Sequence, residues 1–178
     1  NHRVLFRQRW GYKKGKQDST KFLKHEEEVV KPLYEDLKEE FLVKKVFDPI
    51  VLYSYFPCKA NDTKLEIYDE EKQNIIATFD FPRQGKFPHR CLADYFKSDS
   101  FDVVGFTFAS SGLNITDFEK EIYDKGEFGR YYQVHGLGVE LAEACAELVH
   151  KQIRLDLNIV DNEKPTLKDV QMKQYQGC

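Results

Sequence analysis

The longest regular pattern of apolar and polar positions runs from Tyr131 to Arg154 and contains no proline. Its apolar residues recur at spacings of three and four, which places them on one face of an α-helix. A second face carries acidic residues at the same spacings. The apolar positions are Leu137, Leu141, Ala144 and Leu148, and the acidic ones are Glu140, Glu143 and Glu147. The sequence therefore predicts a long helix with an apolar stripe beside a row of carboxylates.

Two glycines, Gly136 and Gly138, lie in the first turns of this predicted helix. Each costs about 1 kcal/mol of helix propensity relative to alanine, so we expect another part of the protein or a ligand to approach the backbone there. Two interpretations of the helix stay open. It is either a core helix with solvated glutamates, or one of its glutamates faces a cationic or amine-bearing ligand.

The spacing of apolar residues in the N-terminal third of the chain predicts helices. Phe6 and Trp10 are four residues apart, which is typical of the inner face of a short packing helix, although a basic and aromatic nucleic-acid patch is the alternative. A further helix is expected from Ser19, with Ser19 or Thr20 as its N-cap. Pro32 is expected to divide this segment or to start a second helix. The shared apolar face comprises Val30, Leu33, Leu37 and Phe41.

From residue 50 onward, the sequence pattern changes to one typical of β-strands. We expect strands over residues 50–56, ended by Pro57, and over 65–68, 75–81 and 101–109. The first three, with polar connections, predict an antiparallel meander. Asp62 and Asp69 lie in the connections, where aspartate favours turns and could also bind a metal. The order of elements favours an α+β domain whose antiparallel sheet is partly covered by helices.

Three segments outside the strands carry further expectations. The proline-containing stretch 81–90 predicts an exposed loop, and residues 167–173 a last short helix. The small residues 110–112 follow a buried strand, and their backbone amides could face a ligand. Thr116 is the expected N-cap of a helix running to about Lys125, with Glu119 completing the cap.

Composition limits the function classes. A chain of 178 residues with 32% charged and 41% hydrophobic residues is long and apolar enough for one globular domain. Its net charge of −3 and the lack of an apolar run near ~20 residues argue against nucleic-acid and membrane partners. No spacing predicts a zinc site or a nucleophile with its base, and a site of His150 with the helix glutamates is weakly supported. We expect a reduced, cytoplasmic protein whose cysteines are Cys58, Cys91, Cys145 and Cys178.

Several runs together resemble one known family. They are RVLFRQRWGY, YFPCKANDTKLEIYD, IIATFDFPRQ, LADYF with FDVVGFTFASSG, YYQVHGLGVELAEACAELVHKQIR and the terminal YQGC. This constellation is similar to the C-terminal activation domain of cobalamin-dependent methionine synthase and covers about residues 5–178. The resemblance implies an α+β fold with a curved central antiparallel sheet, flanking helices and one long helix near the C-terminus. We treat residues 1–178 as one such domain, apparently truncated at its C-terminal end.

The resemblance also implies a role within an enzyme. The whole enzyme, a 5-methyltetrahydrofolate–homocysteine methyltransferase, passes a methyl group through cobalamin. Its activation domain binds S-adenosylmethionine for the reductive remethylation of cob(II)alamin in methionine biosynthesis. The implied partners are the cobalamin-binding domain, which holds the cobalamin, and flavodoxin or a flavoprotein reductase. The fragment alone is expected to have no catalytic residue and no metal.

The resemblance assigns S-adenosylmethionine contacts to Glu143, Tyr175 and Gly177. Three departures from the family pattern bear on the affinity for S-adenosylmethionine. Lys173 stands where some members carry glutamate, a family aspartate has no clear equivalent around residues 1–2, and an arginine segment that follows YQG in the family lies beyond Cys178. We therefore expect this chain alone to bind the ligand weakly or not at all.

Two alternatives remain at this stage. The chain could be a stand-alone binding module that docks on and reactivates another corrinoid protein. It could also be a structural interaction protein that has lost the ligand.

Overall fold

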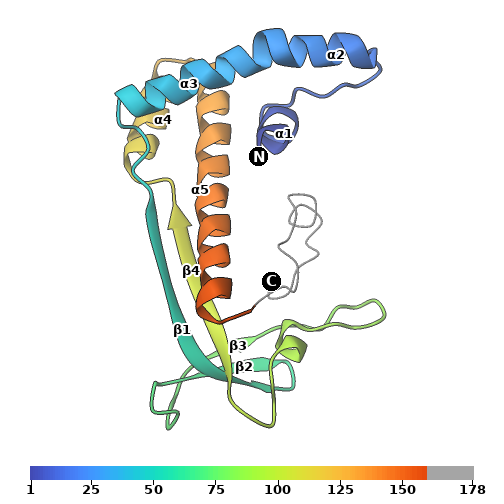
Figure 1. Cartoon of the computed structure of the whole chain (residues 1–178), viewed down its shortest axis with the longest axis vertical. Helices are drawn as coiled ribbons and strands as arrows, with labels where there is room; N and C mark the ends of the chain where they lie inside the picture. The colour runs from blue at the N-terminus through green and yellow to red at the C-terminus, as the bar shows by residue number, and fades with distance from the viewer. Residues whose placement is uncertain (160–178) are drawn as a thin grey trace. The chain divides into compact units, whose positions relative to one another are not determined.

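The computed structural model describes residues 1–159, and they form two compact units. Of the described residues, 1–52 and 108–159 form the helical unit, and Tyr53–Thr107 form the sheet unit. The chain passes between them within β1 (Ile50–Asn61) and β4 (Asp102–Ser110). The expected α+β class, with an antiparallel sheet, several helices and one long helix near the C-terminus, is confirmed (Figure 1).

The helical unit contains a long helical rod and a long single helix (Figure 1). The rod runs without a break from Ser19 to Val43, and Pro32 lies in the first turn of its last segment, as predicted. Proline has no N–H to donate to the preceding turn, and the π-helical segment η2 lies directly before α3. The elements are α1 His2–Val4, η1 Leu5–Arg9, α2 Ser19–His25, η2 Glu26–Val30, α3 Lys31–Val43, α4 Asn114–Asp124 and α5 Phe128–Asp156, with η1 and η2 π-helical.

Both predicted N-caps are wrong. Helix α2 is capped by Asp18, whose Oδ1 accepts hydrogen bonds from the amides of Thr20 at 2.9 Å and Lys21 at 3.2 Å. Aspartate is as good a cap as serine, so the pattern alone did not separate neighbouring candidates. The expected capping role of Ser19 or Thr20 is therefore taken by the residue before them.

Helix α4 begins at Asn114, two residues before the predicted cap Thr116. The amide of Asn114 donates to Asp48 Oδ1 at 3.2 Å, so a carboxylate 66 residues away satisfies the helix start. Glu119 does not complete a cap; its Oε2 lies 3.3 Å from His135 Nδ1 on α5. A cap supplied from a distant segment leaves no local sequence signal.

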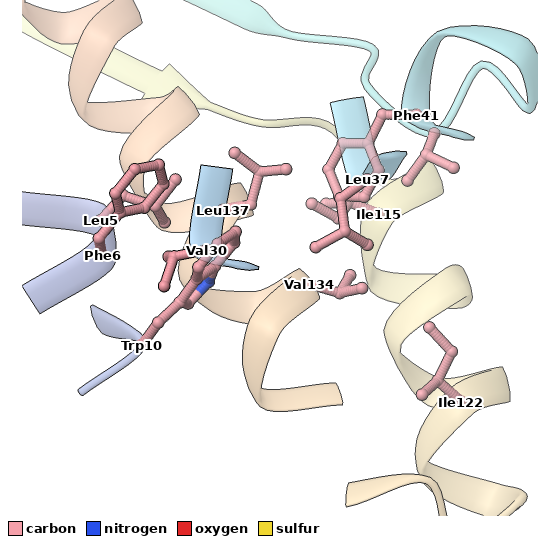
Figure 2. Packing of buried hydrophobic residues seen from close by; sticks show 11 residues of the cluster. Leu5, Phe6, Trp10, Val30, Leu37, Phe41, Ile115, Ile122, Val134 and Leu137 are labelled. Carbon is pink, nitrogen blue, oxygen red and sulfur yellow. The ribbon is translucent and has the colours of Figure 1, made fainter. Parts of the chain in front are cut away.

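The core of the helical unit joins η1, η2, α3, α4 and the first half of α5 (Figure 2). The expected packing role of Phe6 and Trp10 is confirmed, since both are buried and their rings stack at 5.5 Å. The expected apolar face of α3 is also confirmed, with Leu33 partly buried against the cluster. The buried members are Leu5, Phe6, Trp10, Val30, Leu37, Phe41, Val46, Ile115, Ile122, Val134 and Leu137.

The close approach predicted at the two helix glycines is real. A Cβ atom added to Gly136 would lie 2.9 Å from Cδ1 of Trp10, and one added to Gly138 would lie 2.4 Å from Cδ1 of Ile115. The lost helix propensity is offset by burial of these apolar side chains. The approaching groups are therefore η1 and α4.

The apolar stripe of α5 follows the prediction only in its first half. Leu137 is buried and Leu141 packs on the core, but Ala144 is exposed and Leu148 is 69% exposed. Further along, the buried positions are Val149 and Ile153. Steps of three and of four both keep a helical face, so the pattern could not tell which side the second half buries.

The sheet has the order β3-β2-β1-β4, with β2 at Lys64–Tyr68 and β3 at Ile75–Asp80. The predicted meander is confirmed, because β1 pairs antiparallel with β2, and β2 with β3. The expected end of the first strand at Pro57 is wrong, since β1 continues to Asn61. Pairing with β2 starts at Cys58, one residue after the proline, so Pro57 lies outside that ladder and its missing N–H is not needed there.

The core of the sheet unit is small and lies on one face of the sheet. Its fully buried members are Cys58, Leu65 and Ile67, and the partly buried side chains packed against them are Phe56, Ala77, Phe81, Phe96 and Val104. The expected exposed loop, residues 81–90, is confirmed. A short 3-10 helix, η3 (Leu92–Tyr95), follows it.

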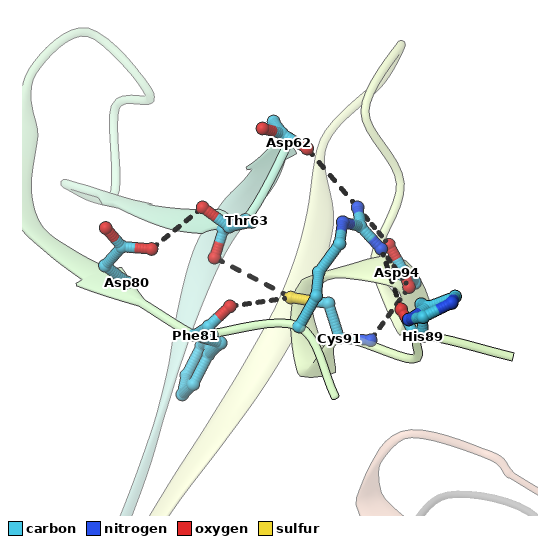
Figure 3. Close-up of polar contacts among 8 residues, drawn as sticks. Asp62, Thr63, Asp80, Phe81, His89, Cys91 and Asp94 are labelled. Atoms are coloured by element: carbon cyan, nitrogen blue, oxygen red, sulfur yellow. Dashed lines mark hydrogen bonds and ion pairs between the residues drawn. The ribbon is translucent and has the colours of Figure 1, made fainter. Parts of the chain in front are cut away.

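Polar contacts fix this loop to η3 (Figure 3). Arg83 makes a two-pronged contact with Asp94, with both N–O distances at 2.9 Å, and its Nη2 also lies 3.3 Å from Asp62 Oδ1. The buried thiol of Cys91 donates to the carbonyl of Phe81 at 3.0 Å. The loop is therefore exposed and yet held at both ends.

The small residues after β4 serve packing. Gly112 has φ +101°, and a Cβ there would lie 1.9 Å from Asp48 Oδ1. Its amide donates to Ser110 Oγ at 3.1 Å, and Ser111 O accepts from the Asp48 amide at 3.3 Å. The Gly112 amide and the Ser111 carbonyl are therefore used by contacts within the fold.

Candidate functional site

The carboxylates on α5 differ sharply in their surroundings. The side chain of Glu140 is 9% exposed, whereas that of Glu143, less than one turn further along, is 63% exposed. Glu140 is thus a buried carboxylate and not one of the solvated glutamates that the sequence predicted. Glu143 keeps a carboxylate that is open to solvent and to ligands.

Arg9, at the end of η1, lies beside both carboxylates. Its Nε lies 3.0 Å from Glu140 Oε1, which is a charge-assisted hydrogen bond. Its Nη2 lies 3.9 Å from Glu143 Oε1, which is an ion pair without hydrogen-bond contact. The guanidinium is therefore held tightly on one side and loosely on the other.

Local packing sets the position of Arg9. The next residue, Trp10, is buried and donates from Nε1 to the carbonyl of Gln133 on α5 at 2.8 Å. Gly136 lets this contact form, because a Cβ there would lie 3.1 Å from the Cβ of Arg9 itself. The end of η1 is thus fixed on α5, and the side chain of Arg9 has a defined origin.

The arrangement can bind charged groups, and it lacks the usual parts of a catalytic centre. A solvent-exposed carboxylate beside a guanidinium favours a ligand with a cationic group and tolerates an anionic one next to it. Among residues 1–159, no group of three or more His, Cys, Asp or Glu side chains is placed to hold a metal ion. The weak metal hypothesis for His150, Glu143 and Glu147 therefore finds no support.

The turn aspartates have structural roles. Asp69 Oδ1 accepts from the amides of Gln73 at 2.7 Å and Asn74 at 3.2 Å. A hydrogen bond from the Asn74 side chain is the main reason why the pKa of Asp69 lies below its usual range, and the contacts from the backbone amides add to it. Asp62 faces Arg83, so neither aspartate belongs to a metal cluster in this part of the chain.

Two of the three predicted ligand contacts cannot be placed. Tyr175 and Gly177, together with Lys173 and the expected helix 167–173, lie outside the described residues. At the other end, the ring of His2 stacks on Phe6 at 5.7 Å. The prediction missed Arg9, whose contact with Glu140 spans 131 positions and leaves no signal in local spacing.

The part of the chain that the structure describes has no helix that is long and apolar enough to cross a membrane. This agrees with the sequence, in which no apolar run reaches the length of a membrane span.

Comparisons with known proteins agree with one another. The family model described as vitamin B12 dependent methionine synthase, activation domain, matches residues 6–178. Methionine synthase of Mycobacterium tuberculosis (strain ATCC 25618 / H37Rv) is 31% identical over 133 residues, and that of Mycobacterium leprae (strain TN) is 32% identical over 128 residues. These alignments cover 70% and 67% of this chain, which spans 11% of each relative.

A solved structure shares the fold. The crystal structure described as the MetH reactivation domain bound to AdoHcy matches with a TM-score of 0.71 and 24% sequence identity. The match covers 86% of this chain and 52% of that one. Together with the family match over nearly the whole length, this shows that the chain belongs to the family of vitamin B12-dependent methionine synthase activation domains.

Proposed function

We propose that this chain forms part of an activation domain that binds S-adenosylmethionine and presents it to a cobalamin held by another domain. S-adenosylmethionine supplies the methyl group for reductive remethylation of cob(II)alamin in a methionine synthase. The observation that carries the proposal is the exposed carboxylate of Glu143 on α5, in a fold shared with a reactivation domain bound to AdoHcy. The chain itself acts in binding and positioning.

Glu143 suits this ligand electrostatically. S-adenosylmethionine carries a sulfonium and an ammonium group, and a carboxylate accepts hydrogen bonds from an ammonium more strongly than a neutral acceptor does. With a side chain 63% exposed, Glu143 can reach a ligand without unfolding its surroundings. The family resemblance implies that Tyr175 and Gly177 contact the same ligand, so we include them in the proposed site.

The wider setting is part of the same proposal. The cobalamin-binding domain of the enzyme would be the partner that receives the methyl group, and flavodoxin or a flavoprotein reductase would deliver the electron. All of these act in the cytoplasm, and the whole enzyme is a 5-methyltetrahydrofolate–homocysteine methyltransferase. The family match favours this setting over a stand-alone module for another corrinoid protein.

The test is calorimetric titration of S-adenosylmethionine into this chain and into a version extended through the next ~60 residues of its gene, a length that would make a domain of ordinary size. We expect the extended version to bind and this chain to bind more weakly or not at all. Failure of both to bind would remove the support for the proposed ligand.

Substitutions in the extended version locate the site. Glu143→Gln keeps the shape of the side chain and removes its charge, and we expect affinity to fall about tenfold or more, since a hydrogen bond to a charged group contributes about 1.5–3 kcal/mol. The control is Glu147→Gln, one turn along the same helix and also exposed. Equal effects of the two substitutions would show that general charge, and not Glu143, matters.

A further inference from the structure

The outer edge of β4 lacks the features with which proteins usually protect an edge strand. β4 is the last strand in the order β3-β2-β1-β4, so within residues 1–159 it has a strand neighbour on one side only. It is nine residues long, and after Asp102 it contains no charged residue and no proline. Unpaired N–H and C=O groups recruit another strand unless lysine, proline, a bulge or a short strand prevents it. β4 therefore offers an open pairing edge.

The other terminal strand, β3, is better protected. It has six residues and ends at Asp80, and Pro82 follows shortly after. Its ladder with β2 also has an irregularity between Ile67 and Tyr68, and such bulges twist an edge away from a flat partner. The difference directs pairing to β4 and makes β3 the matched control.

The side chains of β4 present apolar surface at this edge. Phe106 is 37% exposed, although its ring lies 5.9 Å from that of Phe56 and 5.6 Å from that of Phe79. Val104 lies on the same face as Phe106 and packs against the core of the sheet unit. Val103, on the opposite face, is 45% exposed. The aromatic cluster on the core face thus extends to the edge of the sheet and stays partly uncovered there.

This edge is complementary to a second copy of itself. In an antiparallel pair related by a two-fold axis normal to the sheet, residues that lie opposite one another are on the same face. With the axis at Gly105, Val104 lies opposite Phe106 of the second copy, and Val103 lies opposite Thr107 of the second copy. An aromatic side chain opposite a β-branched one is a favourable cross-strand pair, and here it occurs twice. Gly105 has no side chain to obstruct the approach at the axis.

The same pairing would enlarge the small core of the sheet unit. That core has only three fully buried side chains, Cys58, Leu65 and Ile67. Because the two-fold axis keeps both core faces on the same side, Phe106 and Val104 of one copy would cover those of the other. The two clusters would then become continuous, and burial of apolar surface is the main favourable term in such an association.

We propose that β4 is a homodimer interface, in which two copies of this chain pair antiparallel in the register centred on Gly105. Two four-stranded sheets then form one continuous sheet. The contact uses the same edge of both copies, so it closes at two and leaves the protected β3 edges outside. The interface is independent of the proposed ligand and lies outside α5.

The first experiment is sedimentation velocity of this chain over a series of concentrations. We expect the mass to rise from the 21.0 kDa of one chain to twice that value and to stop there. Thr107→Lys places an ammonium group on the exposed edge and should raise the dissociation constant of the dimer about tenfold or more. The control is Thr78→Lys, at an exposed position of β3, which should leave the dissociation constant unchanged.

A cysteine variant tests the register. Residues directly opposite in an antiparallel pair have Cα atoms about 4.5–5.5 Å apart, within the range of about 4.4–6.8 Å that a disulfide spans. With dissolved oxygen as oxidant, Gly105→Cys should give a covalent dimer that a reducing agent separates. The unsubstituted chain and Thr78→Cys show how much linkage arises without the pairing, and an equal yield from all three would overturn the register.

Other results would overturn the dimer itself. One is a monomer at every concentration, and another is a mass that keeps growing beyond two copies, as head-to-tail pairing of β4 with β3 would produce. Equal weakening by the two lysine variants would place the association on another surface, once circular dichroism and the unfolding temperature show that both variants are folded. A dimer that becomes monomeric in the extended version would show that another segment of the longer chain occupies the edge, and the second copy would be the wrong partner.

Discussion

The helical and sheet units are stabilised in different ways. The helical unit buries a large apolar cluster drawn from five segments, including both η1 and α5 (Figure 2). The sheet unit has only three fully buried apolar side chains in its cluster. Burial of apolar area is the main stabilising term in folding, so we expect the helical unit to contribute more of the chain's stability.

The sheet unit compensates with polar contacts at its surface. Arg83, Asp94 and the buried Cys91 fix the loop after β3 (Figure 3). Asp69 organises the turn before β3. Exposed ion pairs contribute little each and weaken as salt or acid is added. We therefore predict that substitutions of buried side chains will lower stability most in the helical unit, and that changes of pH will alter stability most in the sheet unit.

The largest effect is expected from Gly112→Ala in the helical unit. The new Cβ would overlap Asp48, with a backbone oxygen at 2.3 Å that cannot move aside as a side chain can, and φ there is +101°. We expect a loss of about 3–5 kcal/mol of unfolding free energy, measured by denaturant titration. The control is Gly126→Ala, where φ is +75° but nothing lies within 4 Å, so only about 1 kcal/mol should be lost. Equal losses would show that the contact with Asp48 does not matter.

The next prediction compares a leucine-to-alanine substitution in the cores of the two units. Leu37 in the helical unit is 4% exposed and Leu65 in the sheet unit is 2% exposed. Both belong to buried clusters, but that of Leu37 is larger, so more neighbours would surround its cavity. We expect Leu37→Ala to cost about 3–4 kcal/mol and Leu65→Ala about 2–3 kcal/mol in denaturant titrations. A larger loss for Leu65→Ala would reverse our ranking of the two units.

Features that depend on local spacing were predictable. The long helix, the strand meander and the apolar face of α3 all follow from periods of 3.6 and 2 residues. The glycines of α5 also carried a signal, because their propensity cost required a close neighbour, which proved to be Trp10 at Gly136 and Ile115 at Gly138. Local periodicity thus predicted which elements form, although it placed the cap of α2 at least one residue too late and the buried face of α5 correctly only in its first half.

Features that depend on distant partners were missed. Arg9 meets Glu140 across 131 positions, and Asp48 caps α4 across 66. The site prediction also did not come from local spacing. Glu143 was assigned by the family resemblance, because the helical period alone gives no reason to choose it over Glu147. The contacts predicted for Tyr175 and Gly177 remain predictions, because both lie outside the described residues.

A smaller, pH-dependent effect is expected at Cys58 in the sheet unit. Burial, with a further contribution from Asp102, raises the pKa of its thiol to about 11. Between about pH 9 and 11 the unfolded chain therefore loses this proton while the folded chain keeps it, and the unfolding free energy falls as the pH rises. Cys58→Ala should flatten this part of the stability profile relative to the unsubstituted protein, measured by denaturant titration at several pH values. An unchanged slope would show that the thiol does not titrate as expected.

The smallest effect concerns the exposed contact between Arg83 and Asp94. The side chain of Arg83, followed by the amide of Cys91, holds the pKa of Asp94 below its usual range. The charged form is thus favoured in the folded state, so its contribution is present above about pH 4 and is lost as the pH falls through the lowered pKa. Asp94→Asn should lower the unfolding temperature slightly at pH 7 and make no difference at the acid end.

Salt provides the matching measurement for this contact. The charge-dependent part of the effect of Asp94→Asn should shrink as the ionic strength rises from about 0.01 M to 1 M, where the screening length falls from about 30 Å to about 3 Å. The control, Asp62→Asn, removes the weaker partner of the same arginine, which lies 3.3 Å away, and should do less. If the effect of Asp94→Asn is independent of both pH and salt, then the capping bond from the Cys91 amide at 2.9 Å, rather than the ion pair, is what fixes the loop in the sheet unit.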